Sequence, residues 1–202
     1  MAAAVESFGR LDIVVTNAGI IRDAVLWKMS DEDFDAVIDV HLRGTFTTVR
    51  EAVRHMRGAG HGGRIICIGS PTGQRGTFGQ TNYAAAKAGI VGMVRTWALE
   101  LQRAGITANA VMPGGVRTAH RRDPHGTADY DGAVRWKTAA QGAATPVLVA
   151  TAPELTGIGG RYFEDCAIAE ENVPGSRTGY ARHAVDPETA QRLWDASADL
   201  VR

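Results

Sequence analysis

The sequence predicts an α/β fold in which a parallel sheet carries helices on both faces. Short apolar runs of strand length alternate along the chain with longer segments whose apolar residues recur every three or four positions. The segments between these runs are too long for hairpins, so consecutive strands are expected to be parallel. The 24 glycines against 7 prolines suit tight turns between strands and helices. Together these observations favour a doubly wound α/β arrangement.

The first two predicted elements are a strand and a long helix. Residues 11–16 form a largely apolar run typical of a buried strand, and residues 17–19 end it. Ser30 precedes three acidic residues, which is a pattern that caps a helix and complements its dipole. Apolar residues then recur at helical spacing, which predicts one helix over residues 31–57 that ends near Gly58.

A second strand and helix follow in the same order. Residues 64–69 form the next buried strand, and a loop with three glycines leads from it. A second long helix is expected over residues 82–103, where Gly105 closes it. This helix carries several small residues, so it can approach another backbone closely, either in the sheet packing or across a subunit boundary.

The last third of the sequence is less regular. Residues 106–112 read as a third buried strand, which residues 113–115 end with a proline and two glycines. A polar, irregular stretch follows. Beyond it we expect a helix around residues 142–151, a short strand at residues 161–163 and a final helix over residues 187–201.

Length and charge limit the classes of function. The chain has 202 residues, which suits a single domain over residues 1–202 with a sizeable core. Its 22 Lys and Arg residues balance 22 Asp and Glu residues. A nucleic-acid surface needs uncompensated positive charge, so the sequence argues against nucleic-acid binding.

Cysteine, histidine and apolar content narrow the class further. Two cysteines, Cys67 and Cys166, are too few for a disulfide framework or a four-cysteine zinc site, and the six histidines lack metal-binding spacing. No apolar run approaches the roughly 20 residues that span a bilayer, and the first ten residues lack the apolar core of a signal peptide. We therefore expect a cytoplasmic protein without a metal site and without membrane contact.

Three residues carry a recognisable chemistry. Tyr83 and Lys87 stand four positions apart near a helix start, so they share one face of that helix. A neighbouring ammonium favours the phenolate, so we expect Lys87 to lower the pKa of Tyr83. Ser70 ends a buried strand, at the edge where open parallel sheets bind ligands. This arrangement predicts proton transfer to and from a substrate oxygen.

At this point the sequence resembles the short-chain dehydrogenase/reductase family, and especially its 3-oxoacyl-reductase-like branch. The matching segments keep the family's order and spacing, and they cover about residues 8–118. They are Asn17-Ala-Gly19, residues 40–44, 63–66, 79–80, 82–89 and 109–114, and Ser70. The resemblance implies a Rossmann-like fold and an NAD(P)-dependent oxidoreductase.

The resemblance also implies residue roles. Tyr83 would be the general acid/base, Ser70 would polarise the substrate carbonyl or hydroxyl, and Lys87 would lower the tyrosine pKa and hold the nicotinamide ribose. Further contacts to NAD or NADP would come from the turns that follow two strands, which are residues Asn17, Ala18, Gly19, Pro113, Gly114, Val116 and Thr118. The substrate would be a small molecule, a secondary alcohol or ketone or a 3-oxoacyl-type compound.

His41 is a departure from the family pattern. Many members carry an asparagine there that helps to hold a water molecule of a proton relay. Histidine can also bond to water, so His41 is a candidate for that relay. A packed core histidine is the alternative, and both interpretations stay open. Trp136 is equally open, since it suits either packing or the lining of a substrate pocket.

The two ends of the chain also depart from the family. The first strand, glycine-rich turn and helix of the family pattern have no counterpart here, so we expect the sheet to lack its N-terminal βαβα portion and to bind the cofactor poorly. Residues 58–63 do spell G-x-G-x-x-G, but they follow a helix and precede a strand, so a helix-ending loop is predicted. Residues from about 165 to 202 are expected to form a C-terminal extension.

Two hypotheses for function follow. The first is an NAD(P)-dependent oxidoreductase that transfers a hydride between the cofactor and a secondary alcohol, a ketone or a 3-oxoacyl-type substrate. The alternative is a catalytically silent fragment that serves only as an oligomer partner. In both, the resemblance implies a homo-oligomer, a dimer or tetramer, assembled through the helices at residues 31–57 and 82–103.

Overall fold

A computed structural model describes residues 1–116, 136–173, 178–180, 186, 188 and 191–192. The chain divides into two compact units, Met1–Ala167 and Ile168–Arg202. Among the described residues, the first unit contains nearly all of the regular structure. No helix among the described residues is long and apolar enough to cross a membrane.

The centre of the first unit is a sheet whose strands follow one another in chain order. The strands are β1 (Ile13–Thr16), β2 (Gly63–Ile68), β3 (Ile106–Val111), β4 (Tyr162–Glu164) and β5 (Ala167–Ile168). The pairings β1–β2, β2–β3 and β3–β4 are all parallel. This confirms the predicted α/β fold with a parallel sheet. The predicted strands each lie within two residues of an observed one, whereas β5 had no counterpart in the prediction.

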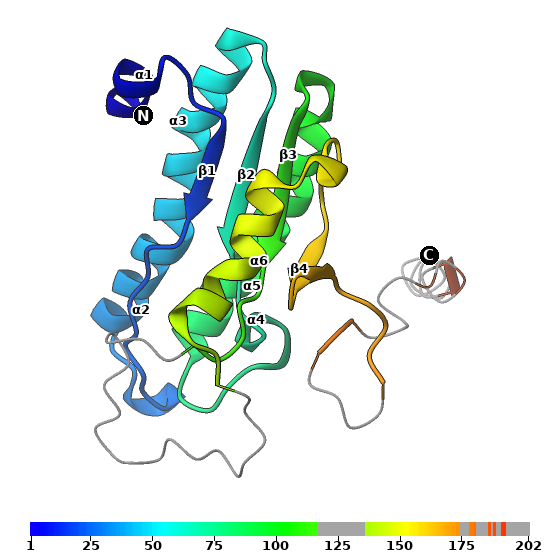
Figure 1. Cartoon of the computed structure of the whole chain (residues 1–202). Coiled ribbons are helices and arrows are strands. Elements are labelled where there is room, and N and C mark those ends of the chain that lie inside the picture. The colour runs from blue at the N-terminus through cyan, green and yellow to red at the C-terminus, as the bar shows by residue number, and fades with distance from the viewer. Residues whose placement is uncertain (117–135, 174–177, 181–185, 187, 189–190, 193–202) are drawn as a thin grey trace, which may run out of the picture. The chain divides into compact units, whose positions relative to one another are not determined.

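Helices cover both faces of this sheet, as predicted. Figure 1 shows α6 (Ala139–Thr151) on one side of the strands and α3 (Gly44–Ala59) on the other. Alternate strand residues point to opposite faces, so β2 contributes to two cores. Ile65 and Cys67 pack with α3 and with α5 (Thr81–Leu101), whereas Ile66 packs with Val149 of α6. Burial raises the pKa of the Cys67 thiol to about 11, so this cysteine stays protonated and inert.

The predicted helix at 31–57 is a continuous helical run in three parts. These are α2 (Asp31–Ile38), a π-helical segment (Asp39–Arg43) and α3. Ser30 caps the run, because its hydroxyl accepts a hydrogen bond from the backbone N–H of Asp33 at 3.1 Å. Gly60 ends it in the left-handed conformation, at φ 70°. A π-helical segment was not predicted, since an inserted residue barely disturbs the apolar spacing.

The helix predicted at 82–103 is α5, which passes into a short 3₁₀ segment (Gln102–Ala104) before Gly105 at φ 66°. The helix predicted at 142–151 begins three residues earlier, at Ala139. Its start is set by a capping box, in which the Thr138 hydroxyl accepts from the Gln141 N–H and the Gln141 side chain accepts from the Thr138 N–H. The T-x-x-Q spacing was the overlooked signal for this start.

The helix α1 (Ala2–Phe8) precedes β1, as the resemblance implies for the start of the chain. One smaller difference is that the glycine loop after β2 contains a one-turn helix, α4 (Thr72–Arg75). In the second unit, backbone hydrogen bonds join Glu170 to Tyr180 and Tyr180 to Asn172. Most of the helix expected at 187–201 lies outside the described residues, and the extent of the C-terminal extension stays a prediction.

Candidate active site

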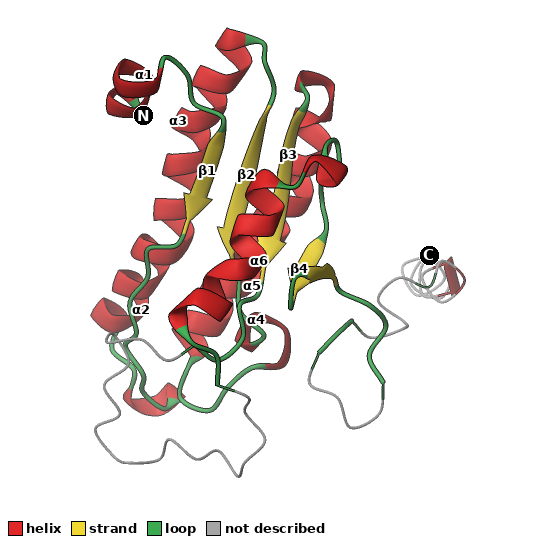
Figure 2. Cartoon of the chain, in the orientation of Figure 1, coloured by secondary structure: helices red, strands yellow, loops and turns green. Residues whose placement is uncertain are grey.

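The carboxyl ends of β1, β2 and β3 meet at one edge of the sheet, where Figure 2 shows all three arrowheads. In the register of the sheet Thr16 lies opposite Cys67, and Ile68 lies opposite Val111. The segments that follow these strands therefore start side by side. This edge brings Asn17, Ser70 and Pro113 into one region, as expected for ligand sites in open parallel sheets.

Ser70 is held at this edge by the one-turn helix that follows it. Its hydroxyl accepts a hydrogen bond from the backbone N–H of Thr72 at 3.2 Å. In the next turn, Gly73 lies so close to α5 that an added Cβ would stand 2.7 Å from the backbone nitrogen of Ala88. Glycine is required at this contact, and the contact fixes the distance between Ser70 and the helix that carries Tyr83.

The start of α5 is fixed by Asn82, for which the sequence analysis gave no role. Its side chain is fully buried and donates to the carbonyl oxygens of Arg22 at 2.9 Å and Asp33 at 3.1 Å. Its amide oxygen accepts from the backbone N–H of Tyr83 at 2.7 Å. Asn82 thus joins the loop after β1, the helix α2 and the first turn of α5, which orients Tyr83.

Tyr83 and Lys87 lie on one face of α5, as predicted, with the lysine Nζ 5.5 Å from the centre of the tyrosine ring. Burial raises the pKa of Tyr83, a hydrogen bond with Ser70 opposes this rise, and the charge of Asp23 adds to it. Burial also lowers the pKa of Lys87 to about 8.

The net shift of the Tyr83 pKa is upward, and the lowering of this pKa by Lys87 stays a prediction. The ammonium group donates to the carbonyl oxygen of Ile68 at 2.7 Å, rather than to the phenol. Lys87 is only 4% exposed, and Tyr83 is largely buried beside it. Burial favours the neutral form of both groups.

His41 lies against Tyr83 and is only 3% exposed. The two rings meet edge to face, with centroids 5.2 Å apart. His41 Nε2 lies 2.8 Å from the carbonyl oxygen and 3.1 Å from the nitrogen of Ile20. Burial lowers the pKa of His41, so the imidazole is neutral at pH 7. Within the described residues its Nδ1 has no hydrogen-bond partner. This placement fits both the relay and the core interpretation.

The turn after β1 is packed directly on His41. A Cβ added to Gly19 would stand 2.4 Å from the imidazole Cε1, so only glycine fits. Asn17 and Ala18, the two residues before it, are exposed at the carboxyl edge. The predicted cofactor turn at Asn17, Ala18 and Gly19 is thus held in place by the packing of Gly19 against the His41 ring.

The loop after β3 lies at the same edge and holds three further predicted cofactor contacts. Pro113 and Val116 are partly buried, and Gly114 is exposed with a φ of 80°. The loop pairs with the start of α6 through a bridge between Val116 and Lys137. The structure thus places Pro113, Gly114 and Val116 together, whereas Thr118 lies outside the described residues.

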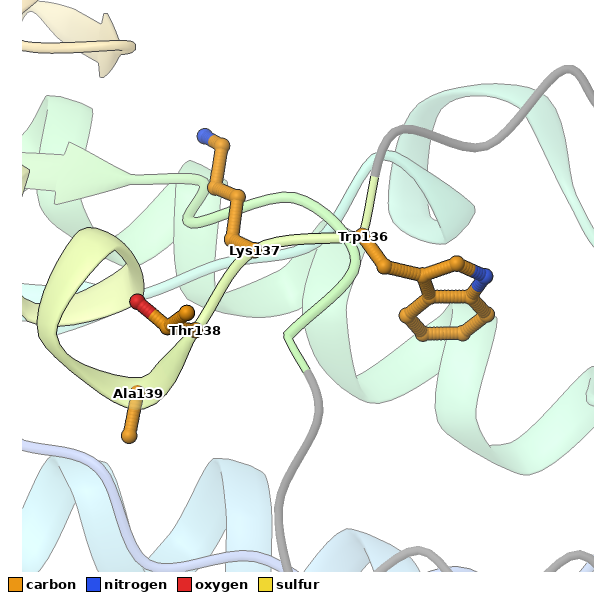
Figure 3. A pocket seen from close by; sticks show the side chains of 4 residues that line it. All are labelled: Trp136, Lys137, Thr138 and Ala139. Atoms are coloured by element: carbon orange, nitrogen blue, oxygen red, sulfur yellow. The ribbon is translucent and has the colours of Figure 1, made fainter.

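A cavity of about 590 Å³ opens beside this loop, at the residues that lead into α6. It is lined by Trp136, Lys137, Thr138 and Ala139 (Figure 3). The Trp136 and Lys137 side chains point to opposite sides of the chain. Trp136 therefore lines a cavity, and its role in a substrate pocket stays a prediction.

A family model described as short chain dehydrogenase matches residues 1–127. The chain belongs to this family. It is 48% identical over 114 residues to the 3-oxoacyl-(acyl-carrier-protein) reductase FabG of Thermotoga maritima, a match that covers 56% of the chain and 46% of that relative.

Two further relatives support the assignment. The short-chain reductase protein NovJ of Streptomyces niveus is 51% identical over 118 residues, which are 58% of the chain and 44% of the relative. An uncharacterised NAD-dependent oxidoreductase of Mycobacterium tuberculosis is 44% identical over 118 residues, which are 58% of the chain and 43% of the relative. The match thus spans slightly less than half the length of these curated relatives. The predicted family is confirmed.

Members of the short chain dehydrogenase family use NAD or NADP, and the described residues fit one end of such a dinucleotide. Lys87 has three N–H donors, of which Ile68 takes one, so donors remain for ribose hydroxyl groups. The exposed Asn17–Ala18 turn lies at the same edge. These groups have the donor and acceptor chemistry that the ribose and nicotinamide require.

The G-x-G-x-x-G sequence at residues 58–63 does not provide the pyrophosphate end. It lies between α3 and β2, as predicted, so it precedes a strand instead of following one. A Cβ on Gly62 would stand 2.7 Å from the Gly105 carbonyl oxygen, and one on Gly63 would stand 2.5 Å from the Met56 sulfur. Both glycines serve close packing. In the described ranges, no loop that leads from a strand to a helix carries this pattern.

Proposed function

We propose that the protein is an NAD(P)-dependent oxidoreductase that transfers a hydride between the cofactor and a secondary alcohol, a ketone or a 3-oxoacyl-type compound. The observation that carries the proposal is the arrangement of Ser70, Tyr83 and Lys87. They lie together where β2 and α5 meet the carboxyl edge of the sheet. Similarity to 3-oxoacyl reductases over about half the chain supports the substrate class.

Tyr83 is the proposed proton donor and acceptor for the reacting oxygen. Its raised pKa keeps the phenol protonated near pH 7, which suits donation to the oxygen of a carbonyl that is being reduced. The Ser70 hydroxyl, already linked to the phenol, would hydrogen-bond the same substrate oxygen. The cofactor, when bound, supplies or accepts the hydride at carbon.

Lys87 and His41 have supporting roles in this proposal. Lys87 would hold the ribose of the cofactor with the N–H donors that Ile68 leaves, and its pKa of about 8 allows proton exchange near neutral pH. His41 Nδ1 is the buried ring nitrogen, without a hydrogen-bond partner among the described residues, that would bind a relay water. Asn17, Ala18, Gly19, Pro113, Gly114, Val116 and Thr118 are the proposed cofactor contacts.

The test of this proposal is the substitution Tyr83→Phe, which keeps the ring and removes the proton. We expect turnover of a simple ketone or 3-oxoacyl ester to fall by about 10²–10⁴-fold, the usual contribution of general acid/base catalysis. Tyr180→Phe in the second unit is the matched control and should keep turnover. Near-native turnover of the Tyr83→Phe protein would exclude Tyr83 as the acid/base.

A second candidate is a protein that acts through self-association alone, and the exposed apolar side chains of α3 and α5 favour it. Phe46 is 41% exposed and Leu99 is 78% exposed. We propose that these two helices form the contact of a dimer or tetramer, with or without catalysis. Sedimentation velocity tests this: a Phe46→Ser, Leu99→Ser double variant should be monomeric at a concentration at which the wild type is not.

A further inference from the structure

Lys137 joins three segments that are far apart in the sequence. It stands one residue before the cap of α6, and its Nζ donates to the carbonyl oxygen of Pro113 at 2.8 Å. The same ammonium forms an ion pair with Asp165, in the turn between β4 and β5. The lysine side chain is 22% exposed, whereas that of Asp165 is 57% exposed, so the ammonium is largely shielded and the carboxylate reaches water.

The backbone around Lys137 strengthens this connection. Its own N–H donates to the carbonyl oxygen of Gly115 at 2.8 Å. At the next residue of the loop, the Val116 side chain packs against Gly142 of α6, where an added Cβ would stand 2.6 Å from Val116 Cγ2. The loop after β3 is therefore attached to the start of α6 by two hydrogen bonds and one close packing contact.

The turn that presents Asp165 is itself fixed. Asp165 and Cys166 have positive φ angles of 46° and 61°, a conformation that is uncommon for residues other than glycine, although aspartate adopts it more readily than most. The backbone N–H of Cys166 donates to the hydroxyl of Thr145 at 3.0 Å, and Thr145 is 1% exposed in α6. Asp165 is thus held at a set position relative to α6, and so is its partner Lys137.

We propose that Lys137 is a positioning residue for the cofactor loop at Pro113–Val116. By pinning the carbonyl of Pro113, its ammonium fixes the peptide plane between Pro113 and Gly114 and with it the direction of the Gly114 N–H. Gly114 needs this support, because its φ of 80° leaves it few restraints of its own. The inference rests on the proposed function, which assigns the nicotinamide contacts to this loop.

Hydrogen exchange of the full chain tests the positioning without any cofactor. In Lys137→Met the amide of residue 137, which is bonded to Gly115, should exchange about tenfold faster, since a charge-assisted anchor of the loop is lost. Lys137→Arg should restore most of the protection. Asp165→Asn alters only an exposed carboxylate, keeps the fold, and should accelerate the same amide by a smaller factor.

Arg64→Met is the matched control, because Arg64 anchors the opposite end of α6. Its guanidinium donates to the carbonyl oxygens of Val149 at 3.0 Å and Ala152 at 2.8 Å. This variant also removes one cation and loosens α6, but it should leave the exchange of residue 137 unchanged. Equal acceleration in Arg64→Met and Lys137→Met would overturn the proposal, as would unchanged exchange in Lys137→Met and Asp165→Asn.

The functional half of the inference is tested by titration with nicotinamide mononucleotide, followed by chemical shifts. Lys137→Met should weaken its binding about tenfold, and Arg64→Met should not. Faster exchange with unaltered mononucleotide affinity would overturn the role toward the cofactor. Failure of the proposed function would show differently, as turnover that survives Tyr83→Phe while the exchange and binding results hold.

Discussion

Two glycine-rich segments flank the strand β2, and they do different work. Residues 58–63 precede the strand and match a dinucleotide fingerprint by spacing, whereas residues 69–79 follow it and match none. In the first segment the glycines end α3 and allow close packing against Gly105 and Met56. In the second, Gly73 allows α4 to pack closely against α5 at Lys87, three residues after Ser70.

The difference lies in the direction of the strand and not in the glycines. A segment that follows a parallel strand emerges at the edge where the neighbouring strands also end, so side chains from several segments meet there. A segment that precedes the strand emerges at the opposite edge, which here holds Asp12, His61 and Arg64. Motif spacing therefore carries meaning only together with its position relative to strand and helix.

The largest expected effect concerns cofactor affinity. Residues 58–63 lie at the edge of the sheet opposite the candidate site, and the described residues provide contacts only for the nicotinamide end of the cofactor. We therefore expect the dissociation constants of NADH and NADPH to be at least about a hundredfold above the low micromolar range. That loss corresponds to about 2.7 kcal/mol or more of binding free energy. Isothermal titration calorimetry of the 202-residue chain measures it.

Fragments of the cofactor sharpen this prediction. Nicotinamide mononucleotide should bind about as well as NADH, since both reach the same groups, and adenosine diphosphate should not bind measurably. Low micromolar binding of NADH, or of adenosine diphosphate alone, would show that another part of the chain holds the pyrophosphate, and the contrast between the two glycine segments would then fail.

The second prediction compares one glycine from each segment. Gly73→Ala places a methyl group 2.7 Å from the backbone nitrogen of Ala88, so α4 must move away from α5. We expect a loss of about 1–3 kcal/mol in the free energy of unfolding, the usual cost of overpacking. Proton transfer should suffer as well, because Ser70 moves with α4. Urea denaturation and turnover measure the two effects.

Gly58→Ala is the matched substitution in the other segment. Gly58 lies in the last turn of α3, and an added Cβ would meet nothing within 4 Å. Alanine is the better helix former, so a gain of roughly 0.5–1 kcal/mol is expected, with unchanged turnover. If Gly73→Ala were as harmless as Gly58→Ala, the close seat of α4 would not matter to the site.

Sequence periodicity predicted the three central strands and the helices between them because buried strands and amphipathic helices leave regular apolar patterns. It did not predict the π-helical segment at Asp39–Arg43 or the short strand β5. Neither leaves such a pattern: the first adds one residue to a helix turn, and the second depends on a two-residue turn at Asp165–Cys166.

At the site, sequence spacing identified Ser70, Tyr83 and Lys87, and the fold places them together. It could not predict that the Lys87 ammonium binds the Ile68 carbonyl, because that bond depends on how deeply α5 is buried against β2. Asn82 and Lys137 were missed for a related reason. Each donates to carbonyl oxygens more than 20 residues away, and no local pattern reports such contacts.

The smallest expected effect is a pH dependence of the free energy of unfolding that arises from Lys87, which is buried against residues 69–79. Its pKa falls from 10.5 to about 8 on folding, so between these values the unfolded chain binds more protons than the folded one. Stability should therefore rise with pH in this window, and below about pH 8 the cost of burying the charge is paid in full.

Urea denaturation at pH 7.5 and pH 9.5 measures this effect against Lys87→Met, which keeps the buried stem and lacks the charge. From pH 7.5 to 9.5 the wild type should gain roughly 1–2 kcal/mol relative to the variant. Tyr83, whose pKa is raised by burial, is present in both proteins, so its own contribution is removed in the comparison. Parallel pH profiles of wild type and variant would mean that Lys87 keeps an ordinary pKa. The carboxyl edge of the sheet would then be open to water. In that case burial would not shift the pKa of a functional group beside residues 69–79, and these residues would not differ from residues 58–63 in this respect.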